Sequence, residues 1–95
     1  MPLHPPDRNY TEVLREDREA IILADQLGFE EAFIGEHVTD KAEAVTSCLI
    51  FIASLIDATK TIKLGSGTVN LPSTHPAAVA AQVVAIAVVA ATTKN

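Results

Sequence analysis

The sequence has 95 residues, 48% hydrophobic and 20% charged, which is the balance of an ordinary globular domain and allows one domain at most. Its net charge is −5 and its basic residues are scattered along the chain, a pattern that argues against nucleic-acid binding. The N-terminus MPLHPPDRN lacks the apolar run of a secretory signal, and the longest apolar tract, 77–91, is too short to span a bilayer, so we expect a cytoplasmic protein with no membrane partner.

Residues 10–27 are predicted to form the first helix. Asn9, followed three residues later by Glu12, has the form of a capping pair, and Gly28 stands where a helix ends in a left-handed residue. The charged residues lie largely outside one stripe at helical spacing, on a face that we interpret as solvated. That stripe consists of Val13, Asp17, Ala20, Ile21, Ala24 and Leu27.

A short strand is predicted next, at residues 32–34, closed by Gly35. A brief continuous apolar run of this kind is typical of a strand covered on both faces. A second helix is expected over about 43–59, followed almost at once by a second strand at 61–68. The single cysteine, Cys48, lies within the apolar run of that helix, which excludes an internal disulfide and favours a buried thiol. One face of this helix carries Val45, Leu49, Ile52 and Ile56.

The third helix is predicted to begin near Pro76, with Thr74 or His75 as its cap. Two strands about 30 residues apart, each followed by a helix, indicate βα units and a parallel sheet. Both a (β/α)₈ barrel and an open doubly wound sheet fit this pattern. A complete barrel takes roughly 250 residues, so a chain of this length could hold about three of its eight units. Uncovered strand edges and apolar helix surface favour a homo-oligomer. Met1–Leu3 can be the tail of an earlier strand.

In both architectures the functional groups gather where the strands end. His37 follows the first predicted strand and can act as a general base, donate a hydrogen bond to a bound ring or ligate a metal, although local hydrogen bonding is the simpler interpretation. Glu36 is not its expected partner, because adjacent strand residues point to opposite faces. No metal-binding motif accompanies the three histidines.

Gly65 and Gly67 end the second predicted strand. They match neither the dinucleotide fingerprint nor a P-loop. Glycine at this place allows a flat ligand to approach the backbone or an unusual peptide geometry to form, and a β-bulge or a tight helix contact is the equally weighted structural interpretation. No nucleophile elbow accompanies these residues, so hydrolase chemistry has no support.

With these residues in place, the chain resembles the N-terminal part of the luciferase-like flavin monooxygenases. The resemblance is carried by MPLHPPDRNY, ADQLGFEEAFIGEH and TKTIKLGSGTVNLPSTHPAAVAAQ, and it covers about residues 1–83. It implies an α/β fold that is a partial (β/α)₈ TIM barrel, with about the first three βα units on a parallel sheet. Residues 1–95 would then be a single N-terminal segment of that barrel.

The resemblance also implies a cofactor, reduced FMN, bound where the strands end, and a reaction in which O₂ oxygenates a small organic substrate. His37 matches the active-site histidine of such enzymes and is the implied catalytic residue. Ser66, Gly67 and Thr68 match a strand end that passes close to the flavin and often carries a non-proline cis peptide, for which the Gly67–Thr68 bond is the candidate. No metal is implied, and a flavin reductase is the implied partner.

Departures from the family pattern limit this transfer. Val38 replaces the second histidine of the luciferase version, so a light-emitting reaction is not supported, and VVAIAVVAATTKN replaces the family's polar-containing helix after Gln82. The groups that hold the flavin phosphate come from later strands in the family, so we expect the 95-residue chain to bind FMN poorly and to show no turnover. Two alternatives stay open: a noncatalytic α/β domain stabilised by self-association, and a deazaflavin-dependent oxidoreductase of the same superfamily.

Overall fold

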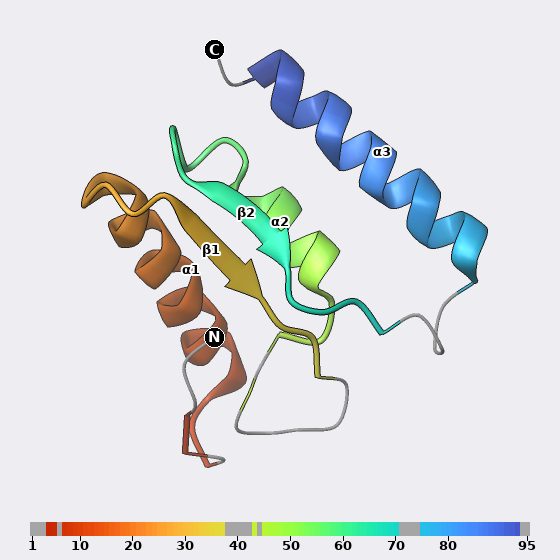
Figure 1. Cartoon of the computed structure of the whole chain (residues 1–95). Helices are drawn as coiled ribbons and strands as arrows, with labels where there is room; N and C mark the ends of the chain where they lie inside the picture. The colour runs from red at the N-terminus through yellow and green to blue at the C-terminus, as the bar shows by residue number, and fades with distance from the viewer. Residues whose placement is uncertain (1–3, 6, 38–42, 44, 71–74, 94–95) are drawn as a thin grey trace.

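The computed structural model describes residues 4–5, 7–37, 43, 45–70 and 75–93. Along these residues the chain forms α1 (Tyr10–Gln26), β1 (Glu31–Ile34), α2 (Cys48–Leu55), β2 (Lys63–Ser66) and α3 (Pro76–Thr93), shown in Figure 1. The order of elements and the α/β class therefore agree with the sequence prediction. Met1–Leu3, interpreted as the tail of an earlier strand, lie outside the described residues.

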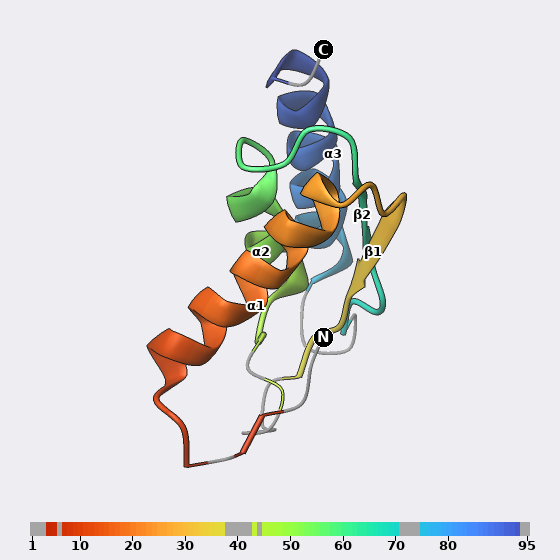
Figure 2. The same cartoon turned by 90° about the vertical axis from the view of Figure 1, so that its left-hand side faces the viewer.

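The sheet of the described residues has two parallel strands. Its register pairs Glu31 with Lys63 and Ile34 with Ser66, and α2 lies in the crossover between the strands. Figure 2 shows the helices on one side of the sheet and the strands at the other side of the molecule. The result is a piece of a parallel βα layer whose second face carries no helix of the described chain.

Helix α1 has the predicted boundaries because both of its ends are capped. The Asn9 side chain accepts a hydrogen bond from the backbone N–H of Glu12 at 3.1 Å, and Gly28 adopts a left-handed φ of 89°. The predicted stripe is wrong at Ala20 and Leu27, which are exposed, and the helix turns Asp25 toward the protein instead. The buried residues of α1 are Val13, Asp17, Ile21 and Asp25.

The two buried aspartates of α1 have different partners. Asp17 is 1% exposed, and its Oδ1 lies 2.7 Å from Nε2 of His4, which ties the N-terminal segment to the helix. Asp25 accepts backbone hydrogen bonds from Lys60, Thr61 and Ile62, each at 2.9 Å. These backbone donors precede β2, so the carboxylate fixes where that strand begins.

Helix α2 and strand β2 are shorter than predicted. Ser47 caps α2 by accepting a hydrogen bond from the N–H of Ile50, and the carbonyl of Val45 accepts one from the N–H of His37, so residues 45–47 do not continue the helix. The predicted strand began at residue 61, but Asp25 binds the N–H groups of residues 60–62, and β2 begins at Lys63. The strand ends at Ser66, two residues before the predicted end.

The core lies between the sheet, α1 and α2. Ile34 and Leu55 are fully buried, and Leu64 and Ala32 pack against the same cluster from the sheet. All four residues predicted on one face of the second helix are buried: Val45, Leu49, Ile52 and Ile56. Cys48 is fully buried and free, as the sequence predicted.

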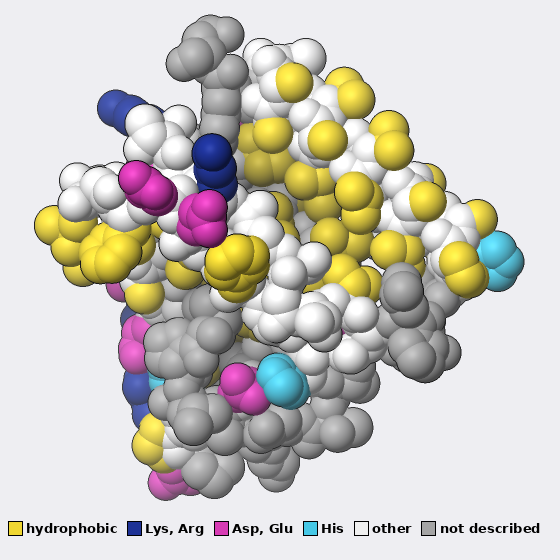
Figure 3. Space-filling view, viewed as in Figure 1, with side chains coloured by type: hydrophobic (Ala, Val, Ile, Leu, Met, Phe, Trp, Pro, Cys, Tyr) yellow, Lys and Arg dark blue, Asp and Glu magenta, His cyan; other side chains and the backbone are white. Residues whose placement is uncertain are grey.

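Helix α3 is capped as predicted, because Nδ1 of His75 accepts a hydrogen bond from the N–H of Ala77 at 3.1 Å. Thr74, the other candidate cap, lies outside the described residues. Val79 is the buried hydrophobic residue of this helix, whereas Val84 is 63% exposed, and Figure 3 shows hydrophobic side chains across its outward surface. Within the described chain, no helix combines the length and apolar character needed to cross a membrane.

Candidate functional site

The ends of β1 and β2 meet at one edge of the sheet, because parallel strands in register run in the same direction (Figure 1). The backbone N–H of Gly67 extends the pairing by donating to the carbonyl of Ile34 at 2.8 Å. The segment Gly35–His37 therefore lies beside Gly67–Asn70. We call these two segments the strand-end edge, and it brings together the residues predicted to carry the chemistry.

His37 is held at the strand-end edge by contacts on its backbone and its ring. Its N–H donates to the carbonyl of Val45 at 2.9 Å, and its Nε2 lies 2.9 Å from Oε2 of Glu43. The imidazole is 44% exposed, so it is accessible to a ligand while one nitrogen is held by a carboxylate. The sequence offered no signal for Glu43 as partner, since it stands six residues away in a loop.

Glu36 turns away from His37, as the alternation of strand residues predicted. Its carboxylate accepts a hydrogen bond from the N–H of Cys48 at 3.0 Å and another from the N–H of Asn70 at 2.8 Å. Burial acts to raise the pKa of Glu36, but the N–H donors of Asn70 and Cys48 outweigh it and lower that pKa below its usual value. Glu36 is therefore a carboxylate at neutral pH.

The peptide bond between Gly67 and Thr68 is cis, as the family resemblance implied. Ser66, Gly67 and Thr68 are all exposed at the open edge. Gly67 adds no side chain of its own to this peptide, and Phe33 lies on the side to which such a side chain would point.

Gly65 in β2 and Gly67 just after it are explained by Phe33 on the neighbouring strand. A Cβ atom on Gly65 would lie 3.0 Å from Cδ1 of Phe33, and one on Gly67 would lie 3.1 Å from its Cβ. The paired register is continuous from Glu31 to Ile34, and the crowding comes from a strand side chain. The structural interpretation of Gly65, a bulge or a helix contact, is therefore wrong, and the unusual peptide geometry expected at these glycines is present at Gly67. The approach of a flat ligand to this strand end stays a prediction.

The Cys48 thiol, the other chemically active side chain near the strand-end edge, is unreactive at neutral pH. Burial, and next to it the charge of Glu36, raises the pKa of Cys48 to about 11, so its thiol stays protonated at neutral pH. Among the described residues, no group of three or more histidine, cysteine or acidic side chains is arranged to hold a metal ion.

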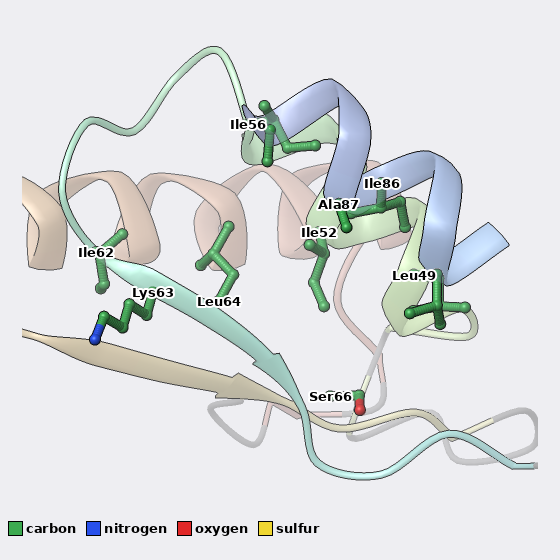
Figure 4. Close-up of a pocket in the computed structure, with 11 residues that line it drawn as sticks. Leu49, Ile52, Ile56, Ile62, Lys63, Leu64, Ser66, Ile86 and Ala87 are labelled. Carbon is green, nitrogen blue, oxygen red and sulfur yellow. The ribbon is translucent and has the colours of Figure 1, made fainter. Parts of the chain in front are cut away.

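An apolar groove of about 430 Å³ lies between α2, α3 and β2 (Figure 4). Leu49, Ile52 and Ile56 line it from α2 and its C-terminus, Ile86 and Ala87 from α3. It includes Ser66 but neither His37 nor the Gly67–Thr68 peptide, and its polar groups are few. The groove is therefore a gap in helix packing, separate from the strand-end edge.

Comparison with known proteins places these features in a family context. The family model described as luciferase-like monooxygenase matches residues 1–91. The chain is 39% identical over 83 residues to 4-hydroxyprotoasukamycin monooxygenase of Streptomyces nodosus subsp. asukaensis, and 39% identical over 83 residues to limonene 1,2-monooxygenase of Rhodococcus erythropolis. These matches include 87% of the chain but 22% and 21% of the two relatives. The chain thus spans about a fifth of their length.

A solved structure shares the fold. It is the oxygenating constituent of 3,6-diketocamphane monooxygenase from the CAM plasmid of Pseudomonas putida, a type II Baeyer–Villiger monooxygenase in complex with FMN. The TM-score is 0.80 at 27% sequence identity, over 85% of this chain and 22% of that one. The α/β arrangement seen here is therefore a partial TIM-barrel-type fold.

Proposed function

Because the chain belongs to the luciferase-like monooxygenase family, we propose that it forms the N-terminal part of a flavin-dependent monooxygenase that uses reduced FMN and O₂ to oxygenate a small organic substrate. The observation that carries this proposal is the strand-end edge, where His37 lies beside the Gly67–Thr68 cis peptide on an open surface. A flavin reductase is the partner that we propose as the source of the reduced cofactor.

The strand-end edge fits the ring of a flavin. A Cβ atom placed on Gly35 would lie 3.6 Å from both the carbonyl oxygen of Gly67 and Nε2 of His37, so the two strand ends and the His37 ring lie close to one another. A flat ring can lie against such a surface, where Ser66, Gly67 and Thr68 are exposed. When bound, reduced FMN would supply the electrons for oxygen activation.

His37 gives this edge a group that can carry a proton. Glu43 holds Nε2, which leaves Nδ1 as the nitrogen available to accept or donate a hydrogen bond. The hydrogen bond from the backbone N–H of His37 to the carbonyl of Val45 fixes the backbone to which the imidazole is attached. We therefore assign His37 the catalytic role and Ser66, Gly67 and Thr68 the cofactor-binding role.

The described residues do not offer a cation for the FMN phosphate at the same edge. Lys60 and Lys63 lie at the opposite end of β2, and Arg8 is paired with Glu16. A phosphate contributes much of the affinity for such a cofactor through charge-assisted hydrogen bonds. We therefore expect weak FMN binding by the 95-residue chain and no measurable turnover.

A titration of the ¹⁵N-labelled chain with oxidised FMN, followed by NMR, tests this proposal. We expect weak binding, with the shifts concentrated at residues 35–37 and 66–70. Shifts spread over the α3 groove instead would contradict the proposed site, and tight stoichiometric binding would contradict the expected weakness. A parallel titration with a deazaflavin separates the FMN enzyme from the deazaflavin alternative.

A chimera tests the activity itself. Residues 1–83 would replace the corresponding segment of limonene 1,2-monooxygenase, and FMN affinity and oxygenation would be measured with a flavin reductase present. We expect oxygenation that falls at least tenfold in the His37→Ala version and stays unchanged in the Glu30→Gln version. A folded, FMN-binding chimera whose turnover ignores His37→Ala would remove the catalytic role of His37.

One observation favours a second function for the isolated chain. The exposed valines of α3 form an apolar surface on a helix without a charged residue. This surface supports a noncatalytic domain that self-associates, in which the strand-end edge has no chemical role. Monomeric behaviour at micromolar concentration would remove this candidate.

A further inference from the structure

Glu36 joins three segments of the strand-end edge. Oε1 accepts the N–H of Cys48, the first residue of α2, and Oε2 accepts the N–H of Asn70. The side-chain Nδ2 of Asn70 donates in return to the carbonyl oxygen of Glu36 at 3.0 Å. One residue thus connects the end of β1, the start of α2 and the segment that follows the cis peptide.

The hydrogen bonds of the Glu36 carboxylate are stronger than those between uncharged groups. A carboxylate that accepts backbone N–H groups forms charge-assisted hydrogen bonds, and the first N–H groups of a helix have no partner within the helix. Glu36 is also partly buried, so water competes less for its oxygens than it would at an exposed site. The three hydrogen bonds therefore resist separation of the two strand ends.

The segments that Glu36 joins carry the proposed site residues. His37 is its immediate neighbour in the chain, and Thr68 stands two residues before Asn70. A displacement of Asn70 relative to β1 would move the cis peptide away from His37, because few rotatable bonds separate these groups. The spacing between the catalytic candidate and the backbone against which a ring would lie thus depends on the Glu36 carboxylate together with the backbone bond from Gly67 to Ile34.

Glu36 itself does not face the open surface. Both carboxylate oxygens are occupied by N–H donors from within the protein, whereas His37 and Ser66–Thr68 are exposed. A ligand at the edge would contact the exposed groups and not the Glu36 carboxylate. Any influence of Glu36 on a ligand is therefore exerted through the positions of its neighbours.

We propose that Glu36 is a positioning residue, whose carboxylate holds His37 and the Gly67–Thr68 peptide at the spacing that a flavin ring requires. The inference rests on the proposed function for the identity of the ligand, but the positioning itself is a property of the flavin-free chain. The two can therefore fail separately.

The test compares Glu36→Gln with wild type, and with Glu30→Gln as the matched control. Glutamine keeps the size of the side chain, but its NH₂ group must face one of the two N–H donors, so one of the hydrogen bonds is lost. Glu30 is exposed at the opposite end of β1 and undergoes the same chemical change. Backbone amide shifts and hydrogen-exchange rates are measured first, and oxidised FMN is then titrated into each chain.

We expect Glu36→Gln to shift the amide signals of His37, Gly67 and Thr68 and to speed exchange at least tenfold at Cys48 or Asn70, whichever faces the new NH₂ group, while the signals of α1 and α3 stay in place. FMN binding should weaken about tenfold, which corresponds to the loss of one hydrogen bond to a charged group. Glu30→Gln should change neither quantity. Unchanged signals at Gly67 and Thr68 in Glu36→Gln would overturn the positioning role.

The FMN arm separates the two proposals. If wild type shows no response to FMN while Glu36→Gln still moves the edge signals, the proposed function fails and the positioning role stands. If wild type binds FMN and Glu36→Gln binds it equally well, the positioning role fails and the proposed function stands.

A further measurement covers the case in which Glu36→Gln does not fold. Couplings across the hydrogen bonds from the amides of Cys48 and Asn70 to the Glu36 carboxylate carbon can be sought in the wild-type chain, and their absence would overturn the proposal. Asn70→Ala removes the side-chain donor to the Glu36 carbonyl and keeps the backbone N–H that donates to the Glu36 carboxylate. It should move the signals of Gly67 and Thr68 in the same direction as Glu36→Gln, by a smaller amount, and a shift in the opposite direction would also count against the proposal.

Discussion

Helices α2 and α3 are both apolar and uncharged, yet they are held very differently. Helix α2 buries Cys48, Leu49, Ile52 and Leu55, and its ends are anchored by the Ser47 cap, the Glu36 carboxylate and a hydrogen bond from Arg18 to the Ser54 carbonyl. Helix α3 offers mostly alanine and valine, and most of these side chains are exposed. Apolar composition alone therefore does not place a helix. Large side chains and directional polar contacts at its ends do.

The largest expected effect comes from removing a core side chain of α2. Leu55→Ala should lower the free energy of unfolding by about 2–5 kcal/mol, because Leu55 is fully buried and its removal leaves a cavity. Val88→Ala, the matched truncation on α3, should change it by at most about 0.5 kcal/mol, because Val88 is exposed. Urea unfolding of the two variants measures both values. Equal losses would break the comparison.

The next largest effect on stability is expected from Asp25, which anchors the start of β2. In Asp25→Asn the new NH₂ group would face a backbone N–H donor, so part of the anchor of β2 is lost. We expect the melting temperature at pH 7 to fall by roughly 10 °C. Asp57→Asn makes the same chemical change at an exposed position and should leave it unchanged.

The pH dependence of the same variant adds a second readout. Hydrogen bonds from the backbone of Thr61, Ile62 and Lys60 lower the pKa of Asp25 to about 2 from its usual 3.8. A pKa that is lower in the folded state stabilises the fold above about pH 4, and that contribution is lost as pH falls toward 2. Melting temperatures measured from pH 2 to pH 6 should show this slope in wild type and a shallower one in Asp25→Asn.

Gly65 in β2 and Gly67 just after it allow a test of how tightly Phe33 packs on the face of the sheet that carries no helix. Gly67→Ala should cost about 1–2 kcal/mol, because the new methyl group meets the Cβ of Phe33, which cannot turn aside. Gly65→Ala should cost less, because it meets the end of an exposed ring that can rotate. Adding Phe33→Ala should relieve Gly65→Ala but not Gly67→Ala. Thermal unfolding of the four variants would contradict this account if the rescue were the same at both positions.

The smallest effect on stability should come from charging the outward surface of α3. Val84→Glu with Val88→Glu should change the free energy of unfolding by less than about 1 kcal/mol, because both side chains are exposed. The same change should reduce self-association, which sedimentation velocity at micromolar concentration measures. A double variant that stays as associated as wild type would show that α3 is not the associating surface.

The elements and their caps could be predicted because their signals are local. Asn9, Gly28 and His75 act through neighbours within three residues, and the cis peptide at Gly67 was implied by family resemblance. The start of β2 could not be predicted, since it depends on hydrogen bonds to the distant Asp25, whereas the Ser47 cap of α2 is a local signal that the prediction did not use. A carboxylate in the last turn of a helix is unfavourable, and Asp25 therefore carried an unused signal of a specific partner.

The sequence predicted the exposed residues of the candidate site but not the residues that support them. His37 and Gly67 follow strands, so topology alone brings them to one edge. Glu43 reaches His37 from within a loop, and Phe33 explains the glycines only through register, which periodicity does not determine. Tertiary contacts of this kind leave no periodic trace in a single sequence.

The bonds from Asp25 to residues 60–62 have a consequence for how the protein is made. The backbone donor at Ile62 lies 37 positions after Asp25. At a synthesis rate of about 5–20 residues per second, roughly 2–7 s pass before that donor follows the carboxylate out of the ribosome. During this interval the backbone groups of β1 lack the strand that pairs with them. The parallel sheet can therefore form only after residues 63–66 have been synthesised.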